Sequence, residues 1–290
     1  MAREVSTGLD NFQRGWYKFS RSKMSIVGLC VVSSIAILAV FAPLVAPYPD
    51  HVGAFLDFSA VFQAPSFEHP FGTDEVGRDV LSRVIFGYRY SLILGLTVLS
   101  LVVPTGTILG LIAGYYKDTW IDTIIMRLTD TFLSLPPLVL ALAIAAILTP
   151  NLFNAMVAIS FAWWPWYCRM IYSITSSLRN EPYILLADVI GTGKIHILLK
   201  EVLPNCTSIL LTKATLDMGF VILIGASLSF LGLGVQPPKP DLGTMLANGT
   251  QYLPEKWWVV IFPALAILSV VVGFNLLGDG LRDALGVEEV

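Results

Sequence analysis

Long apolar runs separated by short polar stretches dominate this chain. No charged residue lies between Lys23 and Asp50, and none lies between Arg89 and Lys117. A third apolar run is interrupted at 149–151 by Thr-Pro-Asn, a combination that favours a turn. Because a helix needs about 20 apolar residues to cross the hydrocarbon layer of a membrane, the pattern predicts six transmembrane helices. They are expected near residues 25–46, 91–115, 124–148, 153–171, 207–234 and 257–279.

The composition indicates that lipid is the solvent for most of the surface. Of the 290 residues, 55% are hydrophobic and only 13% are charged, and the mean hydropathy is +0.73. Soluble domains carry about 25% charged residues, and the apolar runs lack the alternation of barrel strands. The fold class predicted is therefore an all-α integral membrane protein. The net charge of -3 offers no basic face for nucleic acid.

The distribution of Lys and Arg predicts the orientation in the membrane, since cytoplasmic loops are enriched in both. With the N-terminus inside, 13 of the 18 basic residues lie on the cytoplasmic side and five lie outside. Both termini are then cytoplasmic. The organisation expected is a cytoplasmic segment 1–24, a first transmembrane helix 25–46, an external loop 47–90, a five-helix core 91–280 with a cytoplasmic loop 172–205, and a cytoplasmic tail 281–290.

The external loop contains the stretch HPFGTDEVGRDVLSRVIFGYRYSL. Apolar residues at helical spacing after Thr73 and Asp74 predict an amphipathic helix on the outer surface, capped by one of these two residues and leading into the second span. Asp79 and Arg83 are expected to pair across one helical turn.

The second span carries Gly106, Gly110 and Gly114 at every fourth position. Small residues at this spacing allow another helix to approach closely within a membrane. A helix-packing role is therefore predicted for these three glycines.

The cytoplasmic stretch EPYILLADVIGTGKIHILLKEVLPN begins at Glu181, and the helical period of its apolar and charged residues predicts one apolar face and one charged face. Breaks at Gly191 and Gly193 predict two short helices with a glycine hinge, the second ended by Pro204 before the next span. Such a segment could lie flat on the inner leaflet or dock into a groove of a cytoplasmic protein. Its nearly equal numbers of acidic and basic residues favour the protein partner.

Catalytic and metal-binding chemistry find little support. The only histidines are His51, His69 and His196, all in predicted loops, and no H-E-x-x-H motif occurs. The sequence GTGK at 191–194 lacks the rest of a phosphate-binding loop. We therefore expect no enzymatic activity, no metal site and no cofactor bound by this chain.

Charged residues in or near the spans are few. Arg127 with Asp130, and Lys213 with Asp217, have the spacing of local ion pairs and are expected near the cytoplasmic ends of helices. A proton- or sodium-coupled carrier would be expected to place charges at the bilayer midplane. The pattern therefore disfavours such a carrier.

The cytoplasmic stretch resembles the coupling loop in the membrane subunits of ABC importers. The positions that match are Leu185-Leu186-Ala187, then Gly191, then Val202-Leu203-Pro204. Leu185 and Leu186 stand where the family has Glu and Ala, and Thr192-Gly193 stands where it has a small Ala-Ser pair. Three further stretches, HPFGTDEVGRDVLSRVIFG, SLSFLGLGVQPPKPDLGTML and FPALAI…FNLLGDGLRDAL, resemble the dipeptide, oligopeptide and nickel permease family. The resemblance, which is to its second-type (C) permease subunit, runs from about residue 15 to about residue 286.

This resemblance implies a type I ABC importer permease fold with six spans in the cell membrane of a prokaryote. It implies a heterodimer with a sister permease, two ABC ATPase subunits that bind ATP and Mg, and an extracytoplasmic substrate-binding protein. The coupling-loop residues it implies are Glu181, Tyr183, Leu185, Leu186, Ala187, Asp188, Gly191, Thr192, Gly193, Leu203 and Pro204. The external motif it implies is Gly72, Thr73, Asp74, Gly77, Arg78 and Asp79, which would face the binding protein or the sister permease.

The cargo expected is a di- or oligopeptide. Relatives with this pattern also carry nickel or a metal chelate, glutathione or an oligosaccharide, so these alternatives stay open. An ATP-independent channel or carrier is the alternative from a different functional class.

Overall fold

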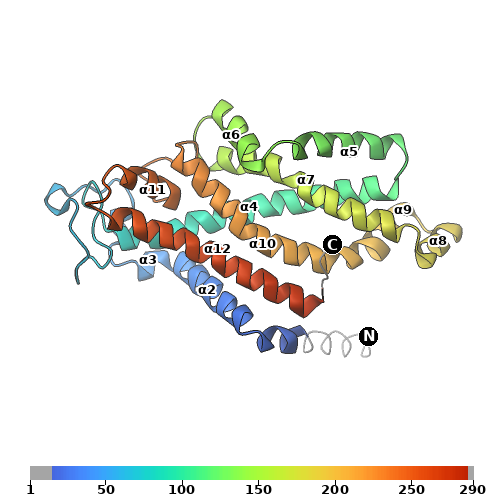
Figure 1. The fold of residues 1–290 in the computed structure, drawn as a ribbon, viewed down its shortest axis with the longest axis horizontal. Coiled ribbons are helices and arrows are strands. Elements are labelled where there is room, and N and C mark those ends of the chain that lie inside the picture. The colour runs from blue at the N-terminus through green and yellow to red at the C-terminus, as the bar shows by residue number, and fades with distance from the viewer. Residues whose placement is uncertain (1–14, 287–290) are drawn as a thin grey trace.

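The protein is an elongated helical bundle in the computed structural model, which describes residues 15–286 (Figure 1). No β-strand occurs in this part of the chain. The helices are α2 (Lys23–Val40), α3 (Ala42–Val45), α4 (Val80–Tyr115), α5 (Trp120–Leu133), α6 (Pro137–Ile147), α7 (Leu152–Leu178), α8 (Pro182–Val189), α9 (Lys194–His196), a π-helical stretch (Ile197–Val202), α10 (Leu203–Phe230), α11 (Leu242–Thr250) and α12 (Trp258–Leu285). Two short 3-10 turns, Pro49–Val52 and Phe58–Ala60, precede α4.

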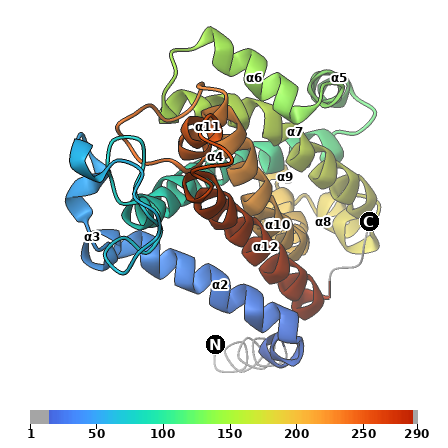
Figure 2. The same cartoon turned by 60° about the vertical axis from the view of Figure 1, so that its left-hand side comes forward.

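The long helices form layers around α4 and α10. Helices α5, α6 and α7 lie on one side of these two, and α12 and α2 lie on the other (Figures 1 and 2). Helices α8 and α9 form one end of the bundle, called here the α8 end. Helix α11 and the segment 46–79 form the opposite end, called the α11 end.

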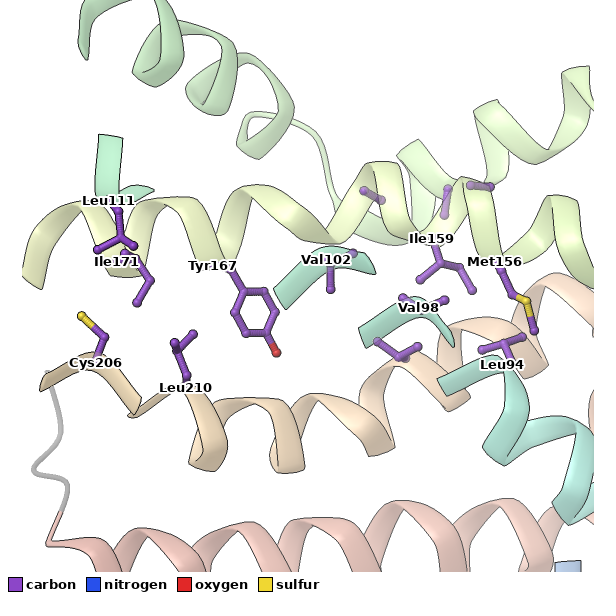
Figure 3. Packing of buried hydrophobic residues seen from close by; sticks show 14 of the residues in the cluster. Leu94, Val98, Val102, Leu111, Met156, Ile159, Tyr167, Ile171, Cys206 and Leu210 are labelled. Carbon is purple, nitrogen blue, oxygen red and sulfur yellow. The ribbon is translucent and has the colours of Figure 1, made fainter. Parts of the chain in front are cut away.

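The main hydrophobic core lies between α4, α7 and α10 (Figure 3). Val98 and Val102 of α4 belong to this core together with Ile159 and Ile171 of α7, and all four side chains are at most 1% exposed. Leu210 of α10 closes this cluster. Three helices distant in sequence therefore share one core.

The three glycines of α4, namely Gly106, Gly110 and Gly114, lie against α7. A Cβ atom on Gly106 would be 2.5 Å from Tyr167 Cβ, and one on Gly110 would be 2.6 Å from the Cys168 carbonyl oxygen. A Cβ atom on Gly114 would be 2.6 Å from Thr175 Cβ. Since real Cβ atoms essentially never approach so closely, only glycine permits this separation of the two helices.

The number of spans differs from the six expected. Within residues 15–286, four helices are long and apolar enough to cross a membrane, and the bent pair α5 and α6 could be a fifth. Helix α7 has 27 residues but does not reach the same hydropathy. The prediction that this protein is all-helical and membrane-spanning agrees with the structure, and the count of six stays a prediction.

The predicted third span, 124–148, is not one straight helix. Helices α5 and α6 meet at an angle of 90° across residues 134–136. Pro136 and Pro137 lie at this break. Proline lacks the N–H that an unbroken helix would need there, and it restricts the residue before it to extended conformations.

Candidate functional site

Helix α8 is bounded by the residues that the sequence marked. Glu181 is its N-cap and Pro182 opens its first turn, where a missing N–H is tolerated. At its end, Gly191 has a φ of +82° and donates its N–H to the Asp188 carbonyl at 3.0 Å. Thr192 donates to the Ala187 carbonyl at 2.9 Å. These two bonds form a Schellman motif, which requires the left-handed conformation that glycine adopts most easily.

One face of the segment from α8 to the start of α10 is packed into the main core. Ile184 is 2% exposed, and Ile197 and Val202 are fully buried. Ala187 and Leu203 are partly buried against the same cluster. These contacts fix the segment firmly to the long helices α4, α7 and α10.

The opposite face of this segment is apolar and exposed. Val189 is 82% exposed, Ile190 is 78% exposed and Ile195 is 74% exposed. We call this surface the α8 patch; its apolar members are Tyr183, Leu185, Leu186, Val189, Ile190, Ile195 and Leu199. The single apolar face expected from the sequence is therefore two faces, because Ile184 and Val202 point inward while Leu185 and Val189 point outward. Gly193 lies beside the patch in open space.

Pro204 does not end the second helix, as the sequence analysis expected. The chain is helical without interruption from Lys194 to Phe230. Pro204 lies in the first turn of α10, directly after the π-helical stretch. There the Leu203 N–H reaches back five residues to the Leu198 carbonyl. A π-turn changes the hydrogen-bond register, so the absent proline N–H does not break the helix.

A polar cleft of 230 Å³ separates α8 from the corner between α4 and α5. The Tyr115 hydroxyl donates to Asp188 Oδ1 at 3.4 Å, and Lys194 Nζ lies 5.2 Å from the centre of the Tyr116 ring. Arg179 Nη1 donates to the Lys117 carbonyl at 3.0 Å. These contacts connect α8, α9 and the end of α7 to the end of the glycine-bearing helix. Sequence reasoning did not identify Tyr115, Tyr116 or Arg179, although a Tyr pair directly after the glycine stripe was visible.

At the α11 end, Asp74 organises the external motif. Its Oδ1 accepts hydrogen bonds from the backbone N–H groups of Val76 and Arg78, at 3.0 and 2.9 Å. Its Oδ2 lies 2.8 Å from Arg78 Nε and 3.4 Å from Arg83 Nε. All three charged residues are buried. Arg83 therefore pairs with Asp74, and the predicted Asp79–Arg83 pair is wrong.

Asp79, rather than Thr73 or Asp74, is the N-cap of α4. Its Oδ2 accepts from the Ser82 N–H at 2.7 Å, and its Oδ1 lies 2.9 Å from His69 Nδ1. The amphipathic helix expected on the outer surface is not separate either, because residues 80–90 are the first turns of α4. The apolar side chains that suggested a surface helix pack instead against α11 and the start of α12.

His51 adds a neutral acceptor to this motif, which the sequence analysis did not foresee. Its Nδ1 accepts from the Asp79 backbone N–H at 3.1 Å, and its ring stacks on Phe55 with centres 3.9 Å apart. Burial lowers the pKa of His51 below its ordinary value of 6.5, since it disfavours the imidazolium.

Backbone geometry and one tryptophan complete the external motif. Gly72 and Gly77 have φ values of +71° and +81°. Thr73 is fully buried, and its carbonyl accepts a hydrogen bond from Trp258 Nε1 at 3.1 Å. The motif is thus a rigid cap that joins the start of α4 to the start of α12.

Some charged residues of the long helices lie at other positions, or have other partners, than the sequence analysis expected. Lys213 Nζ lies 3.1 Å from Asp217 Oδ2, so this predicted pair is confirmed. Because the helix begins at residue 194 and runs to 230, the pair lies near the middle of α10 and not at its end. Asp130 pairs with Arg169 of α7, so the predicted Arg127–Asp130 pair is wrong.

Two protein-family models match this chain. Residues 106–286 match the family described as binding-protein-dependent transport system inner membrane component. Residues 11–65 match the N-terminal TM domain of oligopeptide transport permease C.

Several dipeptide permeases are similar over almost the whole chain. The dipeptide transport system permease protein DppC of Alkalihalophilus pseudofirmus is 41% identical over 279 residues, 96% of this chain and 90% of that protein. The di/tripeptide transport system permease protein DppC of Pseudomonas aeruginosa is 43% identical, with 93% of this chain and 90% of that protein covered. DppC of Escherichia coli K12 is 44% identical, with 94% and 92% covered. The chain belongs to the family of inner membrane components of binding-protein-dependent transport systems.

Proposed function

We propose that this chain is the permease subunit of an ATP-driven importer of di- or oligopeptides, and that the α8 patch is the surface on which an ATPase subunit docks. The observation that carries the docking proposal is the division of the segment into two faces. One face is packed into the main core, and the opposite apolar face is exposed to solvent. This arrangement suits an element that transmits the motion of a bound ATPase subunit to the long helices. An apolar surface of this kind is typical of a protein interface.

The proposal includes partners that this chain needs for transport. A sister permease would supply the other half of the path, and two ABC ATPase subunits would bind ATP and Mg. An extracytoplasmic binding protein would deliver the peptide at the α11 end, where the external motif lies. The family description, which specifies binding-protein-dependent transport, supports this assembly.

The proposed topology has six spans, counted as α2, α4, the bent pair α5 and α6, α7, α10 and α12. The α8 end would face the cytoplasm together with both termini. Basic residues support this orientation, because Lys117, Arg179, Lys194 and Lys200 all lie at the α8 end.

Peptide cargo is proposed because the similar proteins above are named as dipeptide permeases. Nickel or a metal chelate, glutathione and an oligosaccharide are the alternative cargoes. Uptake by proteoliposomes that contain the whole complex and its binding protein would decide between them. ATP-dependent uptake of a dipeptide is expected, and dipeptide uptake without ATP would favour a channel or carrier.

The docking proposal is tested by purifying the tagged chain in mild detergent, intact and with Val189→Asp. We expect the intact chain to bring down a second permease and the ATPases. Val189→Asp places a charge in the α8 patch without changing the core, so it should release the ATPases and keep the sister permease. Lys239→Asp, an exposed change at the α11 end, is the matched control and should keep every partner. Retention of the ATPases by Val189→Asp would contradict the assignment of the patch.

A further inference from the structure

An ion pair lies within α10, one of the helices that are long and apolar enough to cross a membrane. Lys213 Nζ is 3.2 Å from Asp217 Oδ1 and 3.1 Å from Oδ2, near the middle of α10. The side chain of Lys213 is 28% exposed and that of Asp217 is 6% exposed. The Asp217 carboxylate is therefore buried, and the Lys213 ammonium is partly exposed on the surface of the protomer.

Tyr167 of α7 completes this group. Its ring centre lies 5.5 Å from Lys213 Nζ. This cation–π contact stabilises the ammonium in addition to its ion pair with Asp217. Its side chain is fully buried, and Figure 3 shows the hydroxyl pointing toward α10. On α10 the Asp217 carboxylate is the hydrogen-bonding neighbour of this hydroxyl, so Tyr167 and Lys213 both contact Asp217.

Lipid is not a suitable neighbour for the exposed ammonium. A charged group at mid-membrane depth is expensive in contact with hydrocarbon, and such groups almost always face a protein interior or a water-filled path. The face of α10 that carries Lys213 should therefore line the solute path.

We propose that Lys213, positioned by Asp217 and Tyr167, is a binding group for the terminal carboxylate of the peptide as it crosses the membrane. This proposal rests on the function proposed above. A dipeptide is a zwitterion with no net charge, and the Lys213–Asp217 pair is also neutral overall. The ammonium can donate to the passing carboxylate while Asp217 keeps the site neutral once the peptide has left.

The test compares a dipeptide with its C-terminal amide in proteoliposomes that hold the whole complex and saturating binding protein. Lys213→Gln alone would leave Asp217 buried without a cation, so the variant used is Lys213→Gln together with Asp217→Asn. Lys213→Arg is the conservative control. The binding protein is identical in all samples, so its own preference cancels when the variant is compared with the unaltered complex.

We expect the double variant to lower kcat/KM for the dipeptide about tenfold or more, which is the loss of one charge-assisted hydrogen bond. For the amide the change should be less than about twofold on the same reasoning, and Lys213→Arg should retain most uptake of both substrates. An equal loss for both substrates would show that the pair only supports the fold and would overturn the proposal. If the unaltered complex moves no dipeptide with ATP, the proposed function fails first.

A second measurement does not depend on cargo. Lys213→Cys, in a Cys30→Ser background, should react with an anionic methanethiosulfonate added in water. Ile37→Cys on the peripheral helix α2, which is 56% exposed but surrounded by apolar residues, should stay unreacted. Failure of the cysteine at 213 to react, with and without ATP, would overturn the assignment of this face to the solute path.

Discussion

At the scale of single residues, the external motif divides two tasks between two aspartates. Asp74 neutralises two buried arginines and accepts two backbone hydrogen bonds, whereas Asp79 caps α4 and pairs with His69. Neither task is visible from spacing along the chain alone. Both contribute to the rigid cap that closes the α11 end.

Asp74→Ala should destabilise the protein strongly. The substitution leaves Arg78 and Arg83 buried without this carboxylate, and removing one partner of a buried ion pair typically costs about 3–5 kcal/mol. The free energy of unfolding of the purified complex measures the effect. Glu68→Ala, at an exposed carboxylate in the same loop, is the control and should change stability little. Equal effects of the two substitutions would contradict the role given to Asp74.

His51 should make the external motif sensitive to acid. Its pKa in the folded protein lies below 6.5, so below that pH the unfolded chain binds the proton more readily than the folded one. The stability that neutral His51 contributes is therefore complete above pH 6.5 and is lost as the pH falls toward the lower, folded pKa. Protonated Nδ1 also cannot accept from the Asp79 N–H.

Thermal unfolding at pH 7.5 and at pH 5 measures this dependence. His51→Asn keeps a hydrogen-bond acceptor near the same place but does not titrate. The melting temperature of this variant should therefore differ less between the two pH values than that of the unaltered protein. A difference as large as that of the unaltered protein would assign the acid sensitivity to another group.

At the scale of elements, the pairing of α4 with α7 depends on the absence of side chains. The glycine stripe was evident from sequence, but its partner helix was not. Helix α7 meets the stripe with Tyr167, Cys168 and Thr175, which show no comparable pattern of small residues. The close approach is therefore achieved from one side only.

Gly110→Ala should weaken this pairing. The new methyl group would lie 2.6 Å from the Cys168 carbonyl oxygen and 2.8 Å from Ile171 Cβ, so the helices must separate. Overpacking of this kind costs about 1–3 kcal/mol. Gly193→Ala is the control, because its φ is ordinary and its Cβ would meet nothing within 4 Å. Thermal unfolding should show a lower melting temperature for Gly110→Ala alone. A similar decrease for both variants would exclude a packing effect.

Two neighbouring positions of the same short helix, α8, should behave differently. Ile184→Ala opens a cavity in the main core and should cost about 2–4 kcal/mol of stability. Leu185→Ala alters only the α8 patch, where the side chain is 51% exposed, and should change stability by less than about 0.5 kcal/mol. It should instead weaken ATPase binding in the purification described above. If Leu185→Ala lowered the stability and Ile184→Ala weakened ATPase binding instead, the assignment of the buried and the exposed face would be wrong.

At the scale of the whole molecule, α4 joins the helical bundle to the cap at the α11 end. Its 36 residues extend about 54 Å at 1.5 Å per residue. The hydrocarbon layer is only about 30 Å thick. Part of α4 therefore extends beyond such a layer, and its first turns contact the segment 46–79.

Cysteine labelling of intact cells tests the proposed orientation. In a Cys30→Ser background, Phe67→Cys at the α11 end should react with a membrane-impermeant maleimide from outside, since Phe67 is fully exposed. Ile190→Cys at the α8 end should react only after the membrane is opened. Labelling in the reverse order would invert the topology.

The sequence by itself determined the membrane class, the main helical runs, the glycine stripe and the family. Each of these depends on local composition or on spacing along one helix, which a linear pattern records directly. The glycine hinge at Gly191 belongs here too, because a left-handed residue after a short helix is a local requirement.

Only the tertiary structure decided how these parts meet. The division of α8 into a buried and an exposed face depends on where α4, α7 and α10 pack, and the Asp74–Arg83 pair depends on the fold of the loop. Pro204 continues a helix because a π-turn changes the hydrogen bonds before it. Lys213 and Asp217 therefore lie near the middle of α10 and not at its end. Contacts between distant segments and backbone register are not local properties, so the linear pattern could not contain them.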